Sequence, residues 1–197
     1  MPIRALVEHR SGREPDSFDD VLAEAAAGGP DAQARLCAWL GPPVAGYLRA
    51  RGADDPDDLA NEVMRRTLRV LHTFRGDARR FRSWVFTIAR NALVDDRRRL
   101  ARRPRTAVLP DHDVDVGGAR PPAEDDALAR LAAERVEERL SSLSPDQRDV
   151  LLLRVVADLS IDQTASVLGK SREAVKALQR RALGALERSL LREGVSR

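Results

Sequence analysis

The chain has 197 residues, enough for one large domain or two small ones, and its net charge of +3 conceals a strong segregation of acidic and basic segments. Hydrophobic residues make up 43% but aromatic residues only 4%, which favours helical cores of Leu, Val and Ala over a β-sandwich. The single cysteine, Cys37, excludes an internal disulfide and a cysteine-rich zinc site, and the lack of a signal-peptide-like or membrane-spanning apolar run predicts a cytoplasmic protein.

The N-terminal part alternates helical periodicity with helix-breaking residues. Residues 1–17 are polar and contain Gly and Pro, so we expect a poorly ordered arm. From Phe18 to Leu48 apolar residues recur at helical spacing, interrupted at Gly28-Gly29-Pro30 and at Gly41-Pro42-Pro43. Two or three short helices are therefore predicted.

The next segment, Asp54 to Phe74, predicts an amphipathic helix with an acidic start. Five acidic residues and no basic ones stand between positions 53 and 62. Acidic side chains in a first turn complement the helix dipole, which accounts for Asp57 and Asp58. The helix dipole does not account for all five acidic residues. A negatively charged patch on a helix also suits docking against a basic protein surface. The residues leave both interpretations open.

A third predicted helix, about Phe81 to Arg99, lies in the strongest concentration of positive charge. Eleven arginines stand between positions 75 and 105, against three acidic residues. Phe81, Trp84 and Phe86 interleave with them, and rings among arginines suit a single nucleic-acid strand, which needs stacking and phosphate contacts. Core packing is the simpler interpretation of Phe81 and Trp84 at their helical spacing. The arginines remain a candidate nucleic-acid surface in either case.

Residues 104–123 contain four prolines and two glycines without sustained periodicity, which predicts a linker. Six acidic residues between positions 111 and 126 make this region negative. Helices are expected over Ala127–Leu143 and again from Pro145, with Ser144 as the cap and Pro145 at the first helical position. These two helices would supply the core for the final segment.

The segment Ser160 to Leu183 has the spacing of a helix-turn-helix. Ala165 is small enough to let a second helix cross close to the first, and Gly169 can adopt the positive φ of a tight turn. Val175 returns an apolar side chain to the seam between the helices. The pattern therefore has a steric cause.

Capping and charge support the same assignment. Ser160 with Gln163 three residues later forms a capping-box pattern, and Ser171 can cap the second helix. Between positions 170 and 192 seven basic residues stand against two acidic ones, as expected of a helix in a DNA groove. The alternative is an ordinary amphipathic hairpin with a solvated arginine face. Because the steric pattern and the basic helix coincide, DNA binding is the preferred interpretation.

Three segments carry a family resemblance: DPDDLANEV at 55–63, FRGDARRFRSWVFTIARNALVDDRRR at 74–99, and LSPDQRDVLLLRVVADLSIDQTASVLGKSREAVKALQRRAL at 143–183. In this order the chain resembles the extracytoplasmic-function (ECF) sigma factors of bacterial RNA polymerase, over about residues 18–190. The resemblance implies an all-α fold with two helical domains joined by a flexible linker. A sigma-2-like domain would span 18–103, the acidic linker 104–123, and a sigma-4-like helix-turn-helix domain 124–192.

The resemblance also implies a factor that directs RNA polymerase core to promoters and assists melting, with no catalytic residue, metal or cofactor. Docking to the β′ clamp helices is implied for Asp57, Asp58, Leu59 and Glu62. Melting of the minus-10 element and binding of its single strand are implied for Trp84, Arg90, Asn91, Arg97, Arg98 and Arg99. Recognition of the minus-35 element is implied for Ser171, Arg172, Glu173, Lys176, Arg180 and Arg181. The implied partners are polymerase core with its β′ and β subunits, promoter DNA and, where one exists, an anti-sigma factor.

Two other classes of function are weaker. A stand-alone helix-turn-helix regulator would carry a dimerisation element, and no heptad seam is found; it also leaves the acidic helix and the arginine-rich helix unexplained. An enzyme would need convergent chemistry, but His9, His72 and His112 fall on unrelated segments and no Gly-rich phosphate loop occurs. Adjacent helical residues such as Asp57 and Asp58 point about 100° apart and do not share a site.

Overall fold

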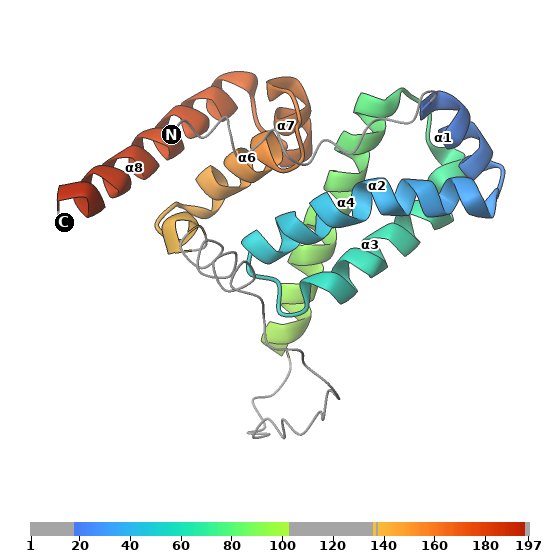
Figure 1. Cartoon of the computed structure of the whole chain (residues 1–197), viewed down its shortest axis with the longest axis horizontal. Helices are drawn as coiled ribbons and strands as arrows, with labels where there is room; N and C mark the ends of the chain where they lie inside the picture. Colours follow the sequence, from blue (N-terminus) through green and yellow to red (C-terminus); the bar gives the residue numbers. More distant parts are fainter. Residues whose placement is uncertain (1–17, 103–135, 137, 196–197) are drawn as a thin grey trace.

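The computed structural model describes residues 18–102, 136 and 138–195, and all regular structure in these ranges is helical (Figure 1). The helices are α1 (Phe18–Ala26), α2 (Pro30–Ala50), α3 (Pro56–Val70), the 3-10 turn η2 (Leu71–Thr73), α4 (Ala78–Arg102), α6 (Pro145–Val155), α7 (Ile161–Leu168) and α8 (Arg172–Val195). The predicted all-α class is confirmed for these ranges. The predicted arm (1–17) and linker (104–123) lie outside the described residues, as does most of the helix expected over 127–143.

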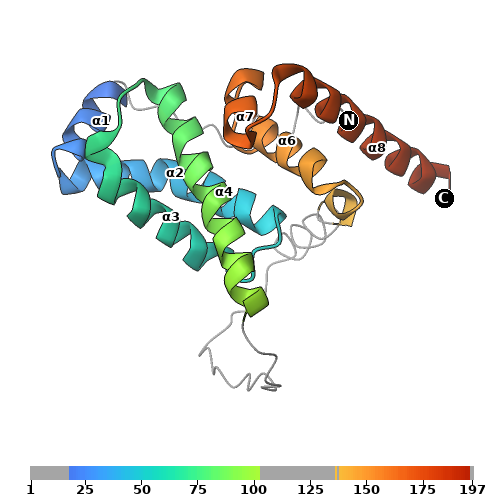
Figure 2. The same ribbon diagram turned by 180° about the vertical axis from the view of Figure 1, so that it is seen from behind.

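The helices form two bundles, which Figure 1 and the reverse view in Figure 2 show side by side. The N-terminal bundle (α1–α4) packs leucines, valines and aromatic rings around α2, α3 and α4. Its largest completely buried side chains include Leu36, Leu40, Tyr47, Phe81 and Phe86. The C-terminal bundle (α6–α8) is smaller and is built on Val150, Leu153, Leu159, Val175 and Ala182. None of the described helices is long and apolar enough to cross a membrane.

Helix α2 differs from the expectation, because it continues through Gly41-Pro42-Pro43 instead of ending there. A proline inside a helix removes one backbone hydrogen bond and clashes with the preceding turn, which favours an interruption. In α2 the side chains on both sides of the prolines, Leu40 and Val44, are completely buried in the bundle. Gly41 has no Cβ to meet the ring of Pro42, which relieves the restriction on a residue that precedes proline. Tertiary packing therefore outweighs the local signal.

Local capping signals, by contrast, are confirmed. Ser144 and Ser160 each form a complete capping box, with Gln147 and Gln163 respectively, and Pro145 takes the first position of α6. Asp55 caps α3 by accepting a hydrogen bond from the backbone N–H of Asp58 at 2.9 Å. These contacts satisfy N–H groups that a helix start leaves without partners. They fix the starts of α3, α6 and α7 where the candidate site needs them.

The two bundles touch along a contact that we call the interdomain seam. It is formed by Tyr47, Arg51, Arg79 and Arg82 of the N-terminal bundle and Asp149, Val156, Ala157, Asp158 and Gln163 of the C-terminal bundle. Helix α7 packs on α4, and α6 lies against α2. No sequence pattern indicated this contact.

The centre of the interdomain seam is polar and buried. Asp149 is 4% exposed and Arg51 8%, and their Oδ1 and Nε atoms form an ion pair at 2.6 Å. The hydroxyl of Tyr47 donates a hydrogen bond to the same Asp149 oxygen at 2.9 Å. Arg97 of α4 donates to the backbone carbonyl of Arg51 and supports its position. Burial, together with the neighbouring Asp149 charge, raises the pKa of Tyr47 well above its ordinary value.

Candidate DNA and polymerase interfaces

Helices α7 and α8 form the helix-turn-helix that the spacing predicts. Gly169 ends α7 with φ of 62° and ψ of 36°, the left-handed conformation that favours glycine. Ala165 and Val175 both lie buried in the seam between the two helices, as expected. Leu178 packs against the core next to Val175, so this face of α8 is turned inward. The opposite face of α8 is thereby fixed toward solvent.

The six residues expected to recognise the minus-35 element all lie at least partly exposed at the start of α8 or just before it. Ser171 caps the helix by accepting a hydrogen bond from the N–H of Ala174 at 3.2 Å. Arg172 pairs with Asp162 of α7 at 2.8 Å. The other members of this group are Glu173, Lys176, Arg180 and Arg181.

Spacing along α8 places these charges on one outer stripe. Arg172, Lys176 and Arg180 follow each other at four-residue intervals, so they stand one above the other on the helix. Among the described residues, Lys176 and Arg180 have no ion-pair partner. This leaves two unpaired cations directed outward, as contacts to phosphate or guanine require.

Helix α4 carries the residues expected at the minus-10 element, but they do not form one cluster. Trp84 is half-buried, with its ring 5.2 Å from that of Phe74 and 5.8 Å from that of Phe81. Asn91 is exposed and Arg90 half-buried on the middle of the helix. Arg97 lies more than three turns further on, about 20 Å from Trp84 at 1.5 Å per residue.

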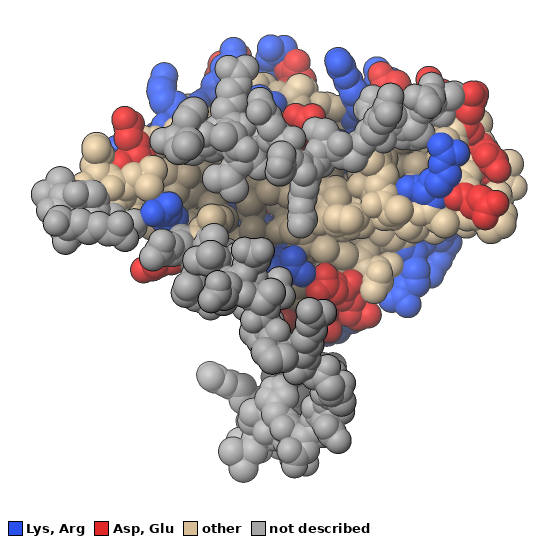
Figure 3. Space-filling view, in the orientation of Figure 1, with Lys and Arg blue, Asp and Glu red and all other residues tan. Residues whose placement is uncertain are grey.

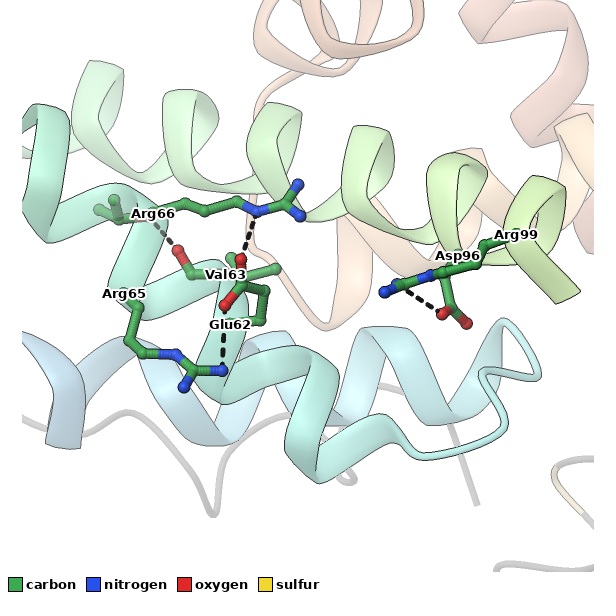
Figure 4. A network of polar contacts seen from close by, with 7 residues as sticks. Glu62, Val63, Arg65, Arg66, Asp96 and Arg99 are labelled. Atoms are coloured by element: carbon green, nitrogen blue, oxygen red, sulfur yellow. Dashed lines mark hydrogen bonds and ion pairs between the residues drawn. The ribbon is translucent and has the colours of Figure 1, made fainter.

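The arginines at the end of α4 are largely engaged in local contacts. Arg99 pairs with Asp96 at 3.0 Å, as Figure 4 shows, and Arg98 lies 3.9 Å from Asp95. Arg97 donates to the backbone of Arg51. Exposed pairs of this kind are weak, so Arg98 and Arg99 can exchange an aspartate for a phosphate at small cost.

The residues expected to dock onto polymerase lie on α3 in three different environments. Leu59 is buried and packs in the core of the N-terminal bundle. Asp57 pairs with Arg49 of α2 at 2.9 Å. Glu62 pairs with Arg65 at 2.9 Å and with Arg66 at 2.7 Å (Figure 4). The hydrogen bond from Arg66 holds the pKa of Glu62 below its ordinary value.

An open groove between α2 and α3 accompanies this surface. The groove is lined by Cys37, Gly41, Pro42 and Ala45 of α2 and by Asp57, Asp58, Ala60, Asn61, Met64, Arg65 and Leu68 of α3. Partial burial raises the pKa of the Cys37 thiol. On the face that Figure 3 shows, uncharged surface covers the region over α2 and the charged side chains lie mainly around its edge.

Comparison with known proteins identifies both bundles. The family model described as Sigma-70 region 2 matches residues 40–103, and the model described as Sigma-70 region 4 matches residues 133–186. The chain is 33% identical over 189 residues to the ECF RNA polymerase sigma factor SigD of Mycobacterium tuberculosis, covering 91% of this chain and 86% of SigD. The chain belongs to the sigma-70 family and is an ECF sigma factor.

Two further relatives extend this result. The ECF RNA polymerase sigma factor BldN of Streptomyces coelicolor is 33% identical over 173 residues, but the chain spans only 65% of its length. The sigma factor CnrH of Cupriavidus metallidurans is 31% identical over 172 residues, with 82% of this chain and 88% of CnrH covered. The solved structure of CnrH in complex with the cytosolic domain of CnrY matches 89% of this chain and 97% of the CnrH chain, with 27% identity and a TM-score of 0.65.

Sigma factors direct RNA polymerase to promoters, and this one has the two regions that its family uses. Region 2 includes α3, α4 and part of α2, and region 4 includes α6, α7 and α8 as far as residue 186. Within region 2 the groove is also lined by Asn61, Met64 and Leu68, which are not among the expected docking residues. A signal was present, because positions 57, 61, 64 and 68 fall on one helical stripe. That stripe mixes polar and apolar residues, so periodicity alone did not single it out.

Proposed function

We propose that this sigma factor recognises a promoter with two separate helices, each in a different bundle. Helix α8 would enter the major groove of the minus-35 element through its exposed outer stripe. The single observation that supports this most strongly is the placement of Lys176 and Arg180, outward and unpaired among the described residues, on a helix whose other face is fixed by Val175. Glu173 on the same face can accept from a cytosine amino group.

Helix α4 would bind the melted minus-10 element. Its exposed Asn91 offers hydrogen bonds to a base edge, and Arg97, Arg98 and Arg99 offer phosphate contacts at its end. Trp84 contributes through the ring cluster with Phe74, where part of the indole remains accessible. Unstacking a base step costs a few kcal/mol, which stacking and phosphate contacts can offset.

The α2–α3 groove would accept a helix of polymerase, the β′ clamp helices being the implied partner. Asp58, exposed at the groove edge, supplies negative charge, and Met64 supplies an adaptable apolar floor. Leu59 and Glu62 would act by holding α3 in shape, since one is buried and the other is paired twice.

An anti-sigma factor is a further proposed partner, supported by the likeness to CnrH in its complex with CnrY.

We also propose that the protein acts in the cytoplasm and is not itself an enzyme. No cluster of three or more potential metal ligands occurs within the described ranges.

Run-off transcription with sigma-free core polymerase tests the proposal. We expect the purified protein to start transcription at a discrete set of promoters from a genomic library. Lys176→Ala should reduce minus-35-dependent initiation about tenfold without changing affinity for core, because a single specific base or phosphate contact contributes about 1–3 kcal/mol. Asp58→Lys should weaken binding to core, with Asp19→Lys at the exposed start of α1 as the matched control. Sequence-specific DNA binding by a dimer without affinity for core would support a stand-alone regulator instead.

A further inference from the structure

Arg172 differs from the other two cations on the outer stripe of α8, because an ion pair holds its side chain in place. Its Nη1 atom lies 2.8 Å from Oδ1 of Asp162, which stands in the first turn of α7. Lys176 and Arg180 have no ion-pair partner among the described residues. The stripe therefore combines two adjustable cations with one whose direction is fixed before DNA arrives.

Local stability does not explain why an arginine stands at this position. Arg172 is the first residue of α8, where the positive end of the helix dipole opposes a cation. The side chains of Arg172 and Asp162 are 58% and 59% exposed, and an ion pair so open to water contributes little to the fold. A residue that breaks a local rule without gain in stability points to a role in function.

The donors that Arg172 still has available suit one of the four bases. The guanidinium presents five N–H donors in a flat fork. Nη1 is directed at the carboxylate of Asp162, so Nη2 and Nε on the other edge remain for a ligand. Two parallel donations from arginine to O6 and N7 of guanine are the commonest specific contact in the major groove. A guanidinium that is already oriented loses less side-chain freedom when it makes this contact.

The carboxylate of Asp162 also disfavours a contact that carries no sequence information. Phosphates are present at every site on DNA, and an unconstrained arginine binds them whatever the sequence. The negative charge of Asp162 repels a phosphate that approaches Arg172, whereas the uncharged edge of a guanine is not repelled in this way. One side chain thus favours the base contact and opposes the phosphate contact.

We propose that Asp162 is a positioning residue that makes Arg172 the reader of one guanine in the minus-35 element. This inference rests on the proposed function, in which α8 enters the major groove. Loss of the Asp162 carboxylate should release Arg172 to the phosphates, so that the protein tolerates other bases at the position where the guanine stands.

Asp146 offers a matched control for Asp162. Each is the second residue of its helix, behind a serine that forms a capping box, so each complements the dipole of its own helix in the same way. Asp146 also pairs with a cation, Lys170, at 2.9 Å. Lys170 precedes α8 and is not part of the outer stripe. Loss of the Asp146 carboxylate therefore reproduces the structural effects without affecting a base contact.

Transcription from a template library with every base at each minus-35 position tests the proposal, with core polymerase and the full chain. We expect the unmodified protein to prefer guanine at one position, and Arg172→Ala to abolish that preference. Asp162→Asn should lower the preference about threefold to tenfold, out of the roughly 5- to 150-fold that a two-pronged base contact provides. Asp162→Glu keeps the charge and should retain most of the preference, and Asp146→Asn should leave it unchanged.

A purely structural role of Asp162 predicts a different result. In that case Asp162→Asn would lower transcription from all templates alike and leave the preference for guanine intact, which would overturn the inference. A loss of preference that Asp162→Asn caused equally in an Arg172→Ala background would also overturn it, because the effect would not pass through Arg172. If the unmodified protein showed no dependence on any minus-35 base, the proposed function itself would be wrong, so the two failures are distinguishable.

Discussion

Two seams meet in the C-terminal bundle, and they are built from opposite chemistry. The seam between α7 and α8 is apolar, with Val175 completely buried and Ala165 nearly so. The interdomain seam places an ion pair and a phenol hydroxyl at its centre. Apolar burial gains free energy in proportion to area, whereas a buried ion pair roughly cancels its own desolvation. The first seam therefore holds a domain together by apolar burial, whereas the polar centre of the second contributes little net free energy to the contact between the two bundles.

The largest expected effect comes from placing a charge in the apolar seam. Val175→Asp buries a carboxylate with no partner, and we expect the C-terminal bundle to lose at least about 4 kcal/mol of unfolding free energy. Thermal unfolding followed by circular dichroism should show the loss of part of the helical signal while the N-terminal bundle melts normally. Lys176→Ala, one residue further and exposed, is the control and should change stability by less than about 0.5 kcal/mol. If Val175→Asp unfolded at the same temperature as the unmodified protein, the packing described for this seam would be wrong.

The interdomain seam can be followed through its tyrosine, which is the only one in the chain. Burial and then Asp149 raise the pKa of Tyr47, so its ultraviolet titration should have a midpoint above the ordinary value of about 10 and return to about 10 in urea. A raised pKa in the folded state means that the contribution of Tyr47 is complete below about pH 10 and is lost as the pH rises through the folded pKa. Asp149→Asn should lower the midpoint. Identical midpoints in folded and unfolded protein would show that the seam is open.

A smaller effect is expected at the turn that joins α7 to α8. Gly169 has φ of 62°, and no atom lies within 4 Å of the position that a Cβ would take, so Gly169→Ala adds backbone strain alone, about 1–2 kcal/mol. Gly184→Ala, inside α8 with ordinary helical geometry, should instead stabilise the protein by about 0.5–1 kcal/mol. Chemical denaturation gives the change in unfolding free energy for each variant. If both variants changed stability in the same direction, the left-handed assignment at Gly169 would be contradicted.

The smallest effect is expected from exposed ion pairs, which contrast with the buried pair in the interdomain seam. The pKa of Glu62 is lowered chiefly by its hydrogen bond from Arg66. Its contribution is therefore present above the unfolded pKa and is lost as the pH falls through the folded pKa, and solvent keeps it small. Carbon-detected NMR titration of the Glu62 carboxylate should show the lowered midpoint, and Arg66→Ala should raise it. A midpoint that does not respond to Arg66→Ala would place the cause elsewhere.

Local signals predicted local structure well. Ser144, Ser160 and Gly169 act within three or four residues of their position, so their spacing alone fixes where α6 and α7 begin and where α7 ends. The outward stripe of α8 followed from the same reasoning, because Val175 determines which face turns inward. These parts of the fold and of the candidate site could be predicted from the sequence, because the interacting residues are also close neighbours in the sequence.

Contacts between residues that lie far apart in the sequence were not predicted. Asp149 is the first residue of the largely apolar run DVLLLRV. Its partners Tyr47 and Arg51 lie about a hundred positions earlier in the sequence. A single sequence contains no direct information on such contacts.

The prolines of α2 have a consequence for how the N-terminal bundle assembles. Pro42 and Pro43 deprive the helix of two backbone N–H donors at its centre. A peptide spanning residues 30–50 should accordingly be mostly unstructured in water, since nothing replaces those bonds outside the bundle. Helix α2 must then form together with its neighbours α1, α3 and α4, so that region 2 is acquired as a single cooperative unit during synthesis and is lost in the same way.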